Sequence, residues 1–176
     1  MASPLNRRTA LLTAVAATVP VAAATPTVAA EPTSRLTPGQ VAAWTAAYFE
    51  AWRTKDAEAA ARLFTDDALY EAIPGVAEQT FKGRTAIKTY WRDVTAGQSD
   101  VTARHGAPLV TGDRACVEMW VTLRAAGANP DGDDWITLIE TNILYFTPDR
   151  LCRRNVEYWN MRLGRLAPPA GWGAAR

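Results

Sequence analysis

Two glutamates and an amide, Glu140, Asn142 and Glu157, have the residue types and spacing to do acid/base chemistry. Glu140 and Asn142 lie two positions apart in a segment with the alternation of a strand, so both share one face. The same alternation puts Glu157 on one face with Trp159. A carboxyl group in an apolar cavity has a raised pKa, which suits it to general acid or base work. We therefore predict that Glu157 moves a proton and that Glu140 is the second carboxyl group of the site.

Both glutamates also have structural interpretations. Glu157 could end a strand at the surface and pair with Arg153 or Arg154. Glu140 could lie at the rim of a cavity and face solvent. The sequence leaves these alternatives open.

Other common catalytic and metal-binding groups are scarce. Beyond the first thirty residues, the common nucleophiles and soft ligands are limited to Ser34, Ser99, His105, Cys116 and Cys152. A structural zinc site needs four such ligands close together. The chain also lacks the nucleophile-elbow, phosphate-loop, dinucleotide-binding and HExxH motifs. We expect no metal and no cofactor, and we interpret the one histidine as a surface or structural residue.

Composition indicates one ordinary globular domain. The 176-residue chain is 48% hydrophobic and 21% charged. It has 19 Lys and Arg against 18 Asp and Glu, for a net charge of +1. Nucleic-acid binding usually requires a marked basic excess, so we expect no nucleic-acid partner.

The first thirty residues are typical of a twin-arginine export signal. Arg7 and Arg8 precede an uncharged apolar run over residues 9–24, and small residues at 28–30 provide a cleavage site. The run is too short and too weakly hydrophobic for a stable membrane anchor. We expect a secreted protein, periplasmic or extracellular. The predicted divisions are a cleaved signal at 1–30, a linker at 31–37, one domain at 38–165 and a tail at 166–176.

Helix signals dominate the region after the linker. Thr37, Pro38 and Gln40 have the form of a capping box with proline at the first helical position, which predicts a helix start. Asp56 can cap a second, short helix. Hydrophobic residues at helical spacing predict a third helix over residues 83–94.

The hydrophobic pattern then changes to the period of two that is typical of strands. Helices first and a sheet afterwards predict an α+β domain, in which the helices close one face of a curved antiparallel sheet. The predicted strands cover residues 68–73, 101–110, 114–125, 135–147 and 151–163.

Both faces of this predicted sheet are apolar. When helices cover only one face of a sheet, the other face is exposed to solvent and is usually polar. An apolar outer face therefore predicts that a second layer packs against it. We predict a homodimer through the outer face, with coverage by the C-terminal tail as the alternative. The outer apolar residues are Trp120, Trp135, Ile139, Ile143 and Tyr145.

The two cysteines are expected on strands that a third strand separates. Strands two places apart lie about 9 to 10 Å from each other, beyond the roughly 7 Å limit for a disulfide. Cys116 and Cys152 are therefore interpreted as small buried or half-buried apolar residues.

Four short motifs carry a family resemblance. Residues 48–56 (YFEAWRTKD), 63–68 (LFTDDA), 81–87 (FKGRTAI) and 157–160 (EYWN) resemble, in this order, the SnoaL-like branch of the nuclear transport factor two-like superfamily. The resemblance implies a cone-shaped sheet wrapped around the N-terminal helices, enclosing an apolar pocket, and commonly a dimer across the sheet. The superfamily contains isomerases, epoxide hydrolases, cyclases, dehydratases and binding proteins, so the fold does not decide the function.

The resemblance assigns roles to single positions. Tyr48 and Asn142 match the two donors with which ketosteroid isomerases hold the developing enolate oxygen, an oxyanion hole. The base of those isomerases falls on Ala72, which cannot move a proton. Limonene epoxide hydrolases use a set of catalytic residues of which this sequence retains the tyrosine, at Tyr70. Glu157 matches the position of the acid on the last strand that activates water in those enzymes.

We therefore predict an exported enzyme that does cofactor-free acid/base chemistry on a small hydrophobic, oxygen-bearing molecule. Isomerisation, cyclisation, dehydration and epoxide opening all stay open. The alternative is a secreted protein that binds such a molecule without turnover, and a structural interaction domain is a third possibility. The expected pocket residues are Trp52, Ala72, Trp91, Val117, Met119, Val121, Leu144 and Trp159.

Overall fold

A computed structural model of the chain describes residues 35–129 and 133–174. These residues belong to one compact unit, Pro32–Arg176. The predicted export signal and most of the predicted linker lie outside the described residues. Within the described ranges, no helix has the length and hydrophobicity that a membrane crossing requires.

The helices form where the local signals predict them. The helices are α1 (Pro38–Thr54), α2 (Ala57–Arg62) and α3 (Arg84–Thr95). The predicted capping box is present, because the Thr37 side chain accepts from the Gln40 amide and the Gln40 side chain accepts from the Thr37 amide. Asp56 caps α2 by accepting a hydrogen bond of 2.8 Å from the Ala59 amide. Two of the three helix starts therefore follow from side-chain capping alone.

Among the described residues, seven strands form one sheet in the order β2-β1-β7-β6-β5-β3, and β4 pairs with β5. The strands are β1 (Phe64–Glu71), β2 (Thr80–Lys82), β3 (Gln98–His105), β4 (Leu109–Thr111), β5 (Arg114–Ala125), β6 (Trp135–Phe146) and β7 (Cys152–Leu163). The predicted antiparallel meander is confirmed for β3, β5, β6 and β7. The sheet is mixed, however, because β1 joins β7 in a parallel pair.

Two of the predicted strands differ in extent from those of the structure. The first strand begins at Phe64 rather than at residue 68 and ends at Glu71. The predicted strand 101–110 divides into β3 and β4. Pro108, which has no amide hydrogen to donate, and the Ala107 amide, which donates to the Gly173 carbonyl at 2.8 Å, interrupt the ladder there.

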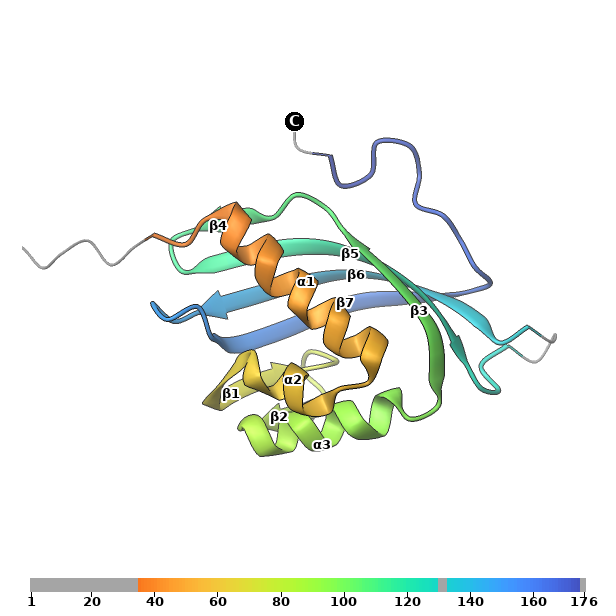
Figure 1. The fold of residues 1–176 in the computed structure, drawn as a ribbon, viewed down its shortest axis with the longest axis horizontal. Helices are drawn as coiled ribbons and strands as arrows, with labels where there is room; N and C mark the ends of the chain where they lie inside the picture. Colours follow the sequence, from red (N-terminus) through yellow and green to blue (C-terminus); the bar gives the residue numbers. More distant parts are fainter. Residues whose placement is uncertain (1–34, 130–132, 175–176) are drawn as a thin grey trace, which may run out of the picture. The chain divides into compact units, whose positions relative to one another are not determined.

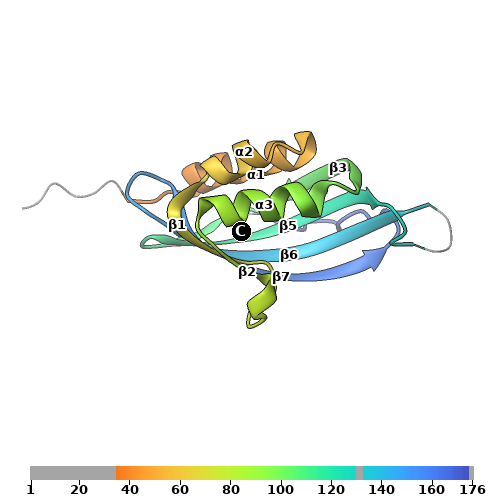
Figure 2. The same cartoon turned by 90° about the horizontal axis from the view of Figure 1, so that it is seen from below.

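All three helices cover the same face of the sheet, and the sheet curves around them (Figure 1, Figure 2). The alternation predicted for β5 is confirmed on this inner face, where Val117, Met119, Val121 and Leu123 are fully buried. They belong to a continuous hydrophobic core with side chains from α1 and α3. The fold is the α+β arrangement that the sequence predicts.

C-terminal residues cover part of the outer face. The Trp120 indole donates to the Leu166 carbonyl at 2.8 Å and packs edge-to-face on Trp172 at 5.8 Å between ring centroids. The backbone of Gly173 lies so close to Gly106 that a Cβ on either residue would come within 3 Å of the other's Cα. Of the two covers predicted for this face, the C-terminal one is present over Trp120, and the homodimer stays a prediction.

The two cysteines lie on β5 and β7 with β6 between them, as expected. Both are free, Cys152 is buried and Cys116 is half-buried. Their separation across an intervening strand follows directly from the order of the meander.

Candidate active site

The carboxylate of Glu157 is the centre of a buried polar cluster. Its Oε1 atom accepts hydrogen bonds from the Tyr48 hydroxyl at 2.7 Å and the Tyr70 hydroxyl at 2.6 Å. It also accepts from the side-chain amides of Asn142 at 3.2 Å and Asn155 at 3.0 Å. All four donors are neutral and almost fully buried. They fix the carboxylate without neutralising its charge.

The two tyrosine hydroxyl groups lie 2.8 Å apart. Each hydroxyl has one hydrogen, so when both donate to Glu157 neither can donate to the other. Burial raises the pKa of Tyr48 and of Tyr70 well above 10, and the nearby charge of Glu157 raises both further. Both tyrosines therefore remain protonated hydrogen-bond donors at physiological pH.

Four elements bring this cluster together. Tyr48 comes from the inner side of α1, and Asn142 on β6 lies directly opposite Glu157 on β7. Tyr70 on β1 is paired with Asn155 on β7 through the parallel ladder. The site therefore depends on the β1–β7 pair, which joins segments far apart in the sequence.

A β-bulge sets the face of the start of β7. Tyr145 pairs with Arg154 but Phe146 pairs with Cys152, so Arg153 is an extra residue in the strand. As a result, Cys152 and Asn155 are both fully buried. The bulge thus lets Cys152 share the buried face with Asn155, whereas Asn155 and Glu157 share it by ordinary alternation.

Glu140 lies near Glu157 on the inner face and has no hydrogen-bond partner for its buried Oε2 atom. Glu140 is opposite Trp159 and Asn142 is opposite Glu157, so the two glutamates are diagonal neighbours, which places them about 7 Å apart. Only 6% of Glu140 is exposed. Burial raises its pKa well above the usual range, and the charge of Glu157 raises it further.

Glu157 differs from Glu140 because it has donors. Burial raises the pKa of Glu157, while its hydrogen bonds from the two tyrosines and the two asparagines oppose that rise. A carboxylate with several donors holds negative charge more easily than one with none. When the pair carries one proton, that proton therefore resides on Glu140. The site can present one protonated and one ionised carboxyl group side by side.

The cluster opens into a cavity of about 200 Å³. Tyr48, Tyr70, Glu140 and Glu157 line it, so the acid/base groups face the space that a ligand would occupy. Its other lining residues are mainly aromatic and aliphatic: Trp52, Tyr90, Trp91, Val94, Thr95, Gln98, Ile136, Leu138, Trp159 and Met161.

Three of the predicted pocket residues, Trp52, Trp91 and Trp159, line this cavity. Two of these indoles are held by hydrogen bonds. Trp52 donates to the Gln98 side chain at 2.6 Å, and Trp159 donates to the Ala72 carbonyl at 2.8 Å. The walls of the cavity are therefore fixed by the fold before any ligand enters.

The other predicted pocket residues do not line the cavity. They are part of the hydrophobic core, which also contains side chains of α1. This helix crosses the inner face of the sheet (Figure 1). The cavity lies instead between α3 and the ends of β6 and β7. The corrected positions are Ala72, Val117, Met119, Val121 and Leu144.

The structural alternatives for Glu157 do not occur. Arg154 pairs with Glu71 at 2.7 Å, and Arg153 pairs with Asp113 at 2.5 Å. Both arginines therefore bind carboxylates away from the cavity, Glu71 at the end of β1 and Asp113 in the turn before β5. Glu140 does not lie at a solvent-exposed rim either, because it is buried.

Sequence reasoning missed Asn155, Tyr90 and Gln98. Asn155 lies two positions before Glu157, so the alternation that selected the glutamate could also have selected it. His105, interpreted as structural, contacts the Gly106 carbonyl at 2.8 Å through its own ring nitrogen. It does not line the cavity. Among the described residues, no group of three or more His, Cys, Asp and Glu side chains is arranged to hold a metal ion.

Comparison with known families agrees with this architecture. Residues 45–147, more than half of the chain, match the SnoaL-like domain. The chain belongs to the SnoaL-like family. The matched region of this SnoaL-like protein includes Tyr48, Tyr70, Glu140 and Asn142 and ends before β7, which carries Glu157.

Solved structures share the fold at low sequence identity. An epoxide hydrolase/cyclase-like enzyme, SalBIII, with a role in pyran ring formation in the polyether salinomycin, is 18% identical. It has a TM-score of 0.58 over 69% of this chain and 92% of its own. A hypothetical protein of ketosteroid isomerase-like fold from Catenulispora acidiphila DSM 44928, in complex with trimethylamine, is 20% identical. Its TM-score is 0.55 over 65% of this chain and 83% of its own. No curated protein matches this SnoaL-like chain.

Proposed function

We propose that this SnoaL-like protein is an enzyme that does cofactor-free acid/base chemistry on a small hydrophobic, oxygen-bearing molecule. The observation that carries the proposal is the pair of buried carboxyl groups at the cavity. Glu157 has four neutral donors and Glu140 has none for its buried oxygen. Such a difference in environment separates the roles of two carboxyl groups into base and acid.

In this mechanism, ionised Glu157 removes a proton from the bound molecule or from a water molecule. Protonated Glu140 donates a proton to the oxygen on which negative charge develops. Tyr48 and Tyr70 hold Glu157 and line the cavity, so they also orient the substrate. Asn142 positions Glu157. The donors that the resemblance assigns to an oxyanion hole therefore act first on the catalytic carboxylate.

Isomerisation, cyclisation, dehydration and epoxide opening each need a proton removed at one atom and added at another. The likeness in fold to an epoxide hydrolase/cyclase-like enzyme makes epoxide opening and ring closure the first reactions to test. The second candidate function is binding without turnover. It is favoured by Ala72, a buried alanine where the resemblance puts the isomerase base.

A ligand screen distinguishes the two functions. The purified chain is tested by thermal shift against terpenoid, steroid, aromatic polyketide and epoxide compounds, and each hit is incubated and analysed by mass spectrometry. A ligand at a hundred times its Kd stabilises by about 2.7 kcal/mol, which is easily measured. We expect at least one hit to change in mass or retention time. Hits that bind unchanged would favour the binding protein and contradict the enzyme.

We also propose that the protein is exported by the twin-arginine route. The support is the Arg7-Arg8 pair followed by an apolar run and small residues. Residues 1–36 fused to a reporter should carry it out of the cytoplasm, and replacing both arginines with lysine should retain it there. If the fusion is still exported after both arginines are replaced with lysine, the twin-arginine route is contradicted.

The homodimer remains a further part of the proposal. Its support is the outer face beyond the C-terminal cover, where Ile139 and Ile143 are half-buried and Tyr158 is 56% exposed. Analytical ultracentrifugation should give a dimer, and Ile143→Glu should give a folded monomer. A monomeric wild-type protein at high concentration would exclude the dimer.

A further inference from the structure

The cavity has an unusual balance of charge. Two carboxyl groups, Glu140 and Glu157, line it, and of the described residues no Lys, Arg or His does. The nearest arginine on the same strand, Arg154, lies on the other face and is paired with Glu71. The protein therefore supplies negative charge to this space and no positive charge to balance it.

Unpartnered acceptor atoms add to the negative potential. Only 6% of the surface of Glu140 is exposed to solvent. Its buried Oε2 atom has no hydrogen-bond partner among the described residues. The side-chain amide nitrogens of Asn142 and Asn155 are used to donate to Glu157. Their Oδ1 atoms are consequently buried without partners. Of these three residues, only Glu140 lines the cavity. A buried acceptor is costly when left alone, so its Oε2 atom marks a place where a donor or a positive group of the ligand would be stabilised.

Aromatic rings form much of the cavity wall. Trp52, Trp91 and Tyr48 pack edge-to-face on one another, with ring centroids 4.8 to 6.3 Å apart. Tyr90 and Trp159 line the cavity as well. The face of an aromatic ring attracts a cation, and aromatic walls combined with carboxylates are a recurrent way to hold quaternary ammonium groups.

The size of the space limits the ligand. A cavity of about 200 Å³ is smaller than the roughly 300 to 1,000 Å³ of sites for drug-sized molecules. We propose that this cavity binds a small organic cation, a tertiary or quaternary amine that also carries oxygen. The proposal rests on the proposed function in that it uses the same cavity and names the class of substrate.

A cationic ligand would complete the site electrostatically. Its ammonium group would lie among the aromatic rings near the ionised Glu157 and supply the counter-charge that the cavity wall lacks. A nearby positive charge favours the ionised form of a carboxyl group, so the ligand would also help to keep Glu157 competent as a base. An anionic ligand of the same shape would meet the negative charge of Glu157 and be rejected.

Three ligands of one shape test this inference by isothermal titration calorimetry on the full chain. They are choline, its neutral analogue in which a tert-butyl group replaces the trimethylammonium group, and the same tert-butyl skeleton ending in a carboxylate. We expect choline to bind about tenfold or more tighter than the neutral analogue, and the anion to bind weakest. Glu157→Gln, which removes the ionised carboxylate of the cavity, should reduce the advantage of choline about tenfold, whereas Glu50→Gln, at the exposed end of α1, should leave it unchanged.

Equal affinities for choline and its neutral analogue would overturn the inference, as would the absence of choline binding at its highest soluble concentration. These outcomes are separable from failure of the proposed function, because the calorimetry needs no turnover. Choline preferred without turnover of any amine or oxygenated ligand would sustain the cation site and contradict the enzyme. Turnover of neutral molecules with no preference for choline would do the reverse.

Discussion

Carboxylates on the two sides of the sheet have opposite environments. Outside the cavity, Glu71 on β1 and Asp113 in the turn before β5 pair with Arg154 and Arg153, which lie next to each other on β7. On the inside, Glu157 on the same strand receives four hydrogen bonds and no ion pair. The strand thus carries its positive charges on one face and its buried acid on the other.

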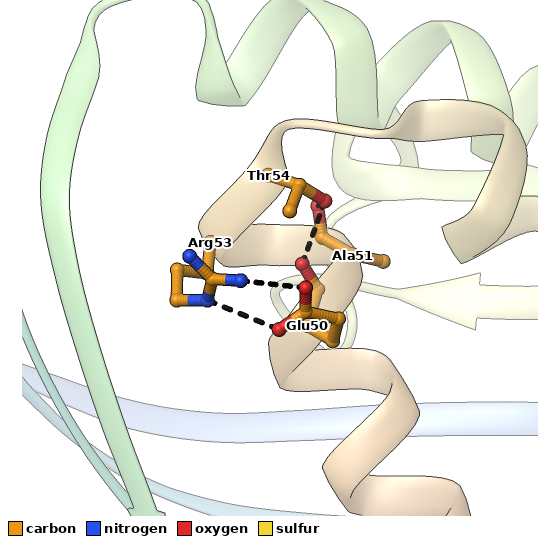
Figure 3. Close-up of polar contacts among 4 residues, drawn as sticks. All are labelled: Glu50, Ala51, Arg53 and Thr54. Carbon is orange, nitrogen blue, oxygen red and sulfur yellow. Dashed lines mark hydrogen bonds and ion pairs between the residues drawn. The ribbon is translucent and has the colours of Figure 1, made fainter.

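The end of α1 shows the simplest version of the outer arrangement. Arg53 binds both carboxylate oxygens of Glu50, at 3.0 and 2.6 Å (Figure 3). Both side chains are more than half exposed, so water screens their attraction. An arginine partner likewise holds the pKa of Asp113 below its usual range.

The comparison shows what makes a carboxyl group useful for proton transfer. A carboxylate paired with arginine stays ionised over the whole physiological pH range. A buried one with neutral donors, or with none, has a raised pKa, which suits it to exchange a proton with a ligand. Six substitutions, two of them matched controls, test this contrast, from the largest expected effect to the smallest.

Glu157→Gln should show the largest effect. Glutamine keeps the shape of the side chain but cannot take a proton, so turnover of the ligand found by the screen should fall about 100-fold or more. Glu71→Gln, the matched change on the outer face, should alter turnover less than about twofold. Rates are followed by mass spectrometry of the product. Equal effects of the two substitutions would remove the distinction between the two faces.

Glu140→Gln should stabilise the protein at alkaline pH. The pKa of this carboxyl group is raised above its ordinary value of 4.5 by burial, so the folded state binds a proton that the unfolded state releases, and stability falls as pH rises through that window. The variant stays neutral throughout. Its free energy of unfolding should exceed that of the wild type near pH 8, with the difference closing toward pH 4.

Asp113→Asn provides the control of opposite sign. Arg153 lowers the pKa of Asp113, so this carboxylate stabilises the fold above its ordinary pKa, and that stability is lost as pH falls through the lowered value. The variant should lose less than about 1 kcal/mol near pH 8, because the pair is exposed to water. Urea unfolding at both pH values measures all three proteins. The same sign for both substitutions would contradict the comparison.

Asn155→Leu should shift the pH dependence of turnover. The amide donates to Glu157 at 3.0 Å, and its removal should raise the pKa of Glu157 further. The acid limb of the pH–rate profile should therefore move to higher pH by about one unit. A lower rate at every pH, with the limb in its original place, would mean that Asn155 supports only the fold.

Glu50→Gln should have the smallest effect. It removes the exposed ion pair of Figure 3, which water and salt already screen. No measurable change in the thermal unfolding midpoint is expected, in low or high salt. A clear loss of stability would show that exposed pairs contribute more here than the comparison allows.

Much of the site could be predicted from local patterns. Alternation along β6 and β7 put Glu140, Asn142 and Glu157 on the inner face, where the structure has them. Alternation cannot say, however, which part of an inner face is covered by a helix and which part opens into a cavity. For that reason Val117 and Leu144 were expected in the pocket but belong to the core.

Cys152 shows a second limit of pattern reasoning. It lies three positions before Asn155, which strict alternation would place on the opposite face, yet both residues are fully buried because of the bulge at Arg153. A bulge changes the face of every residue on one side of it, and its position follows from how two strands meet.

By itself, the sequence determined the elements and their faces. Capping residues at Thr37 and Asp56 set helix starts, and the period of two set the strands, because these signals act between residues close together in the chain. Only the tertiary structure decided the chemistry. A pKa depends on the charges and donors within a few ångströms and on the exclusion of water. For Glu157 those neighbours come from α1, β1 and β6, up to 109 positions away in the sequence.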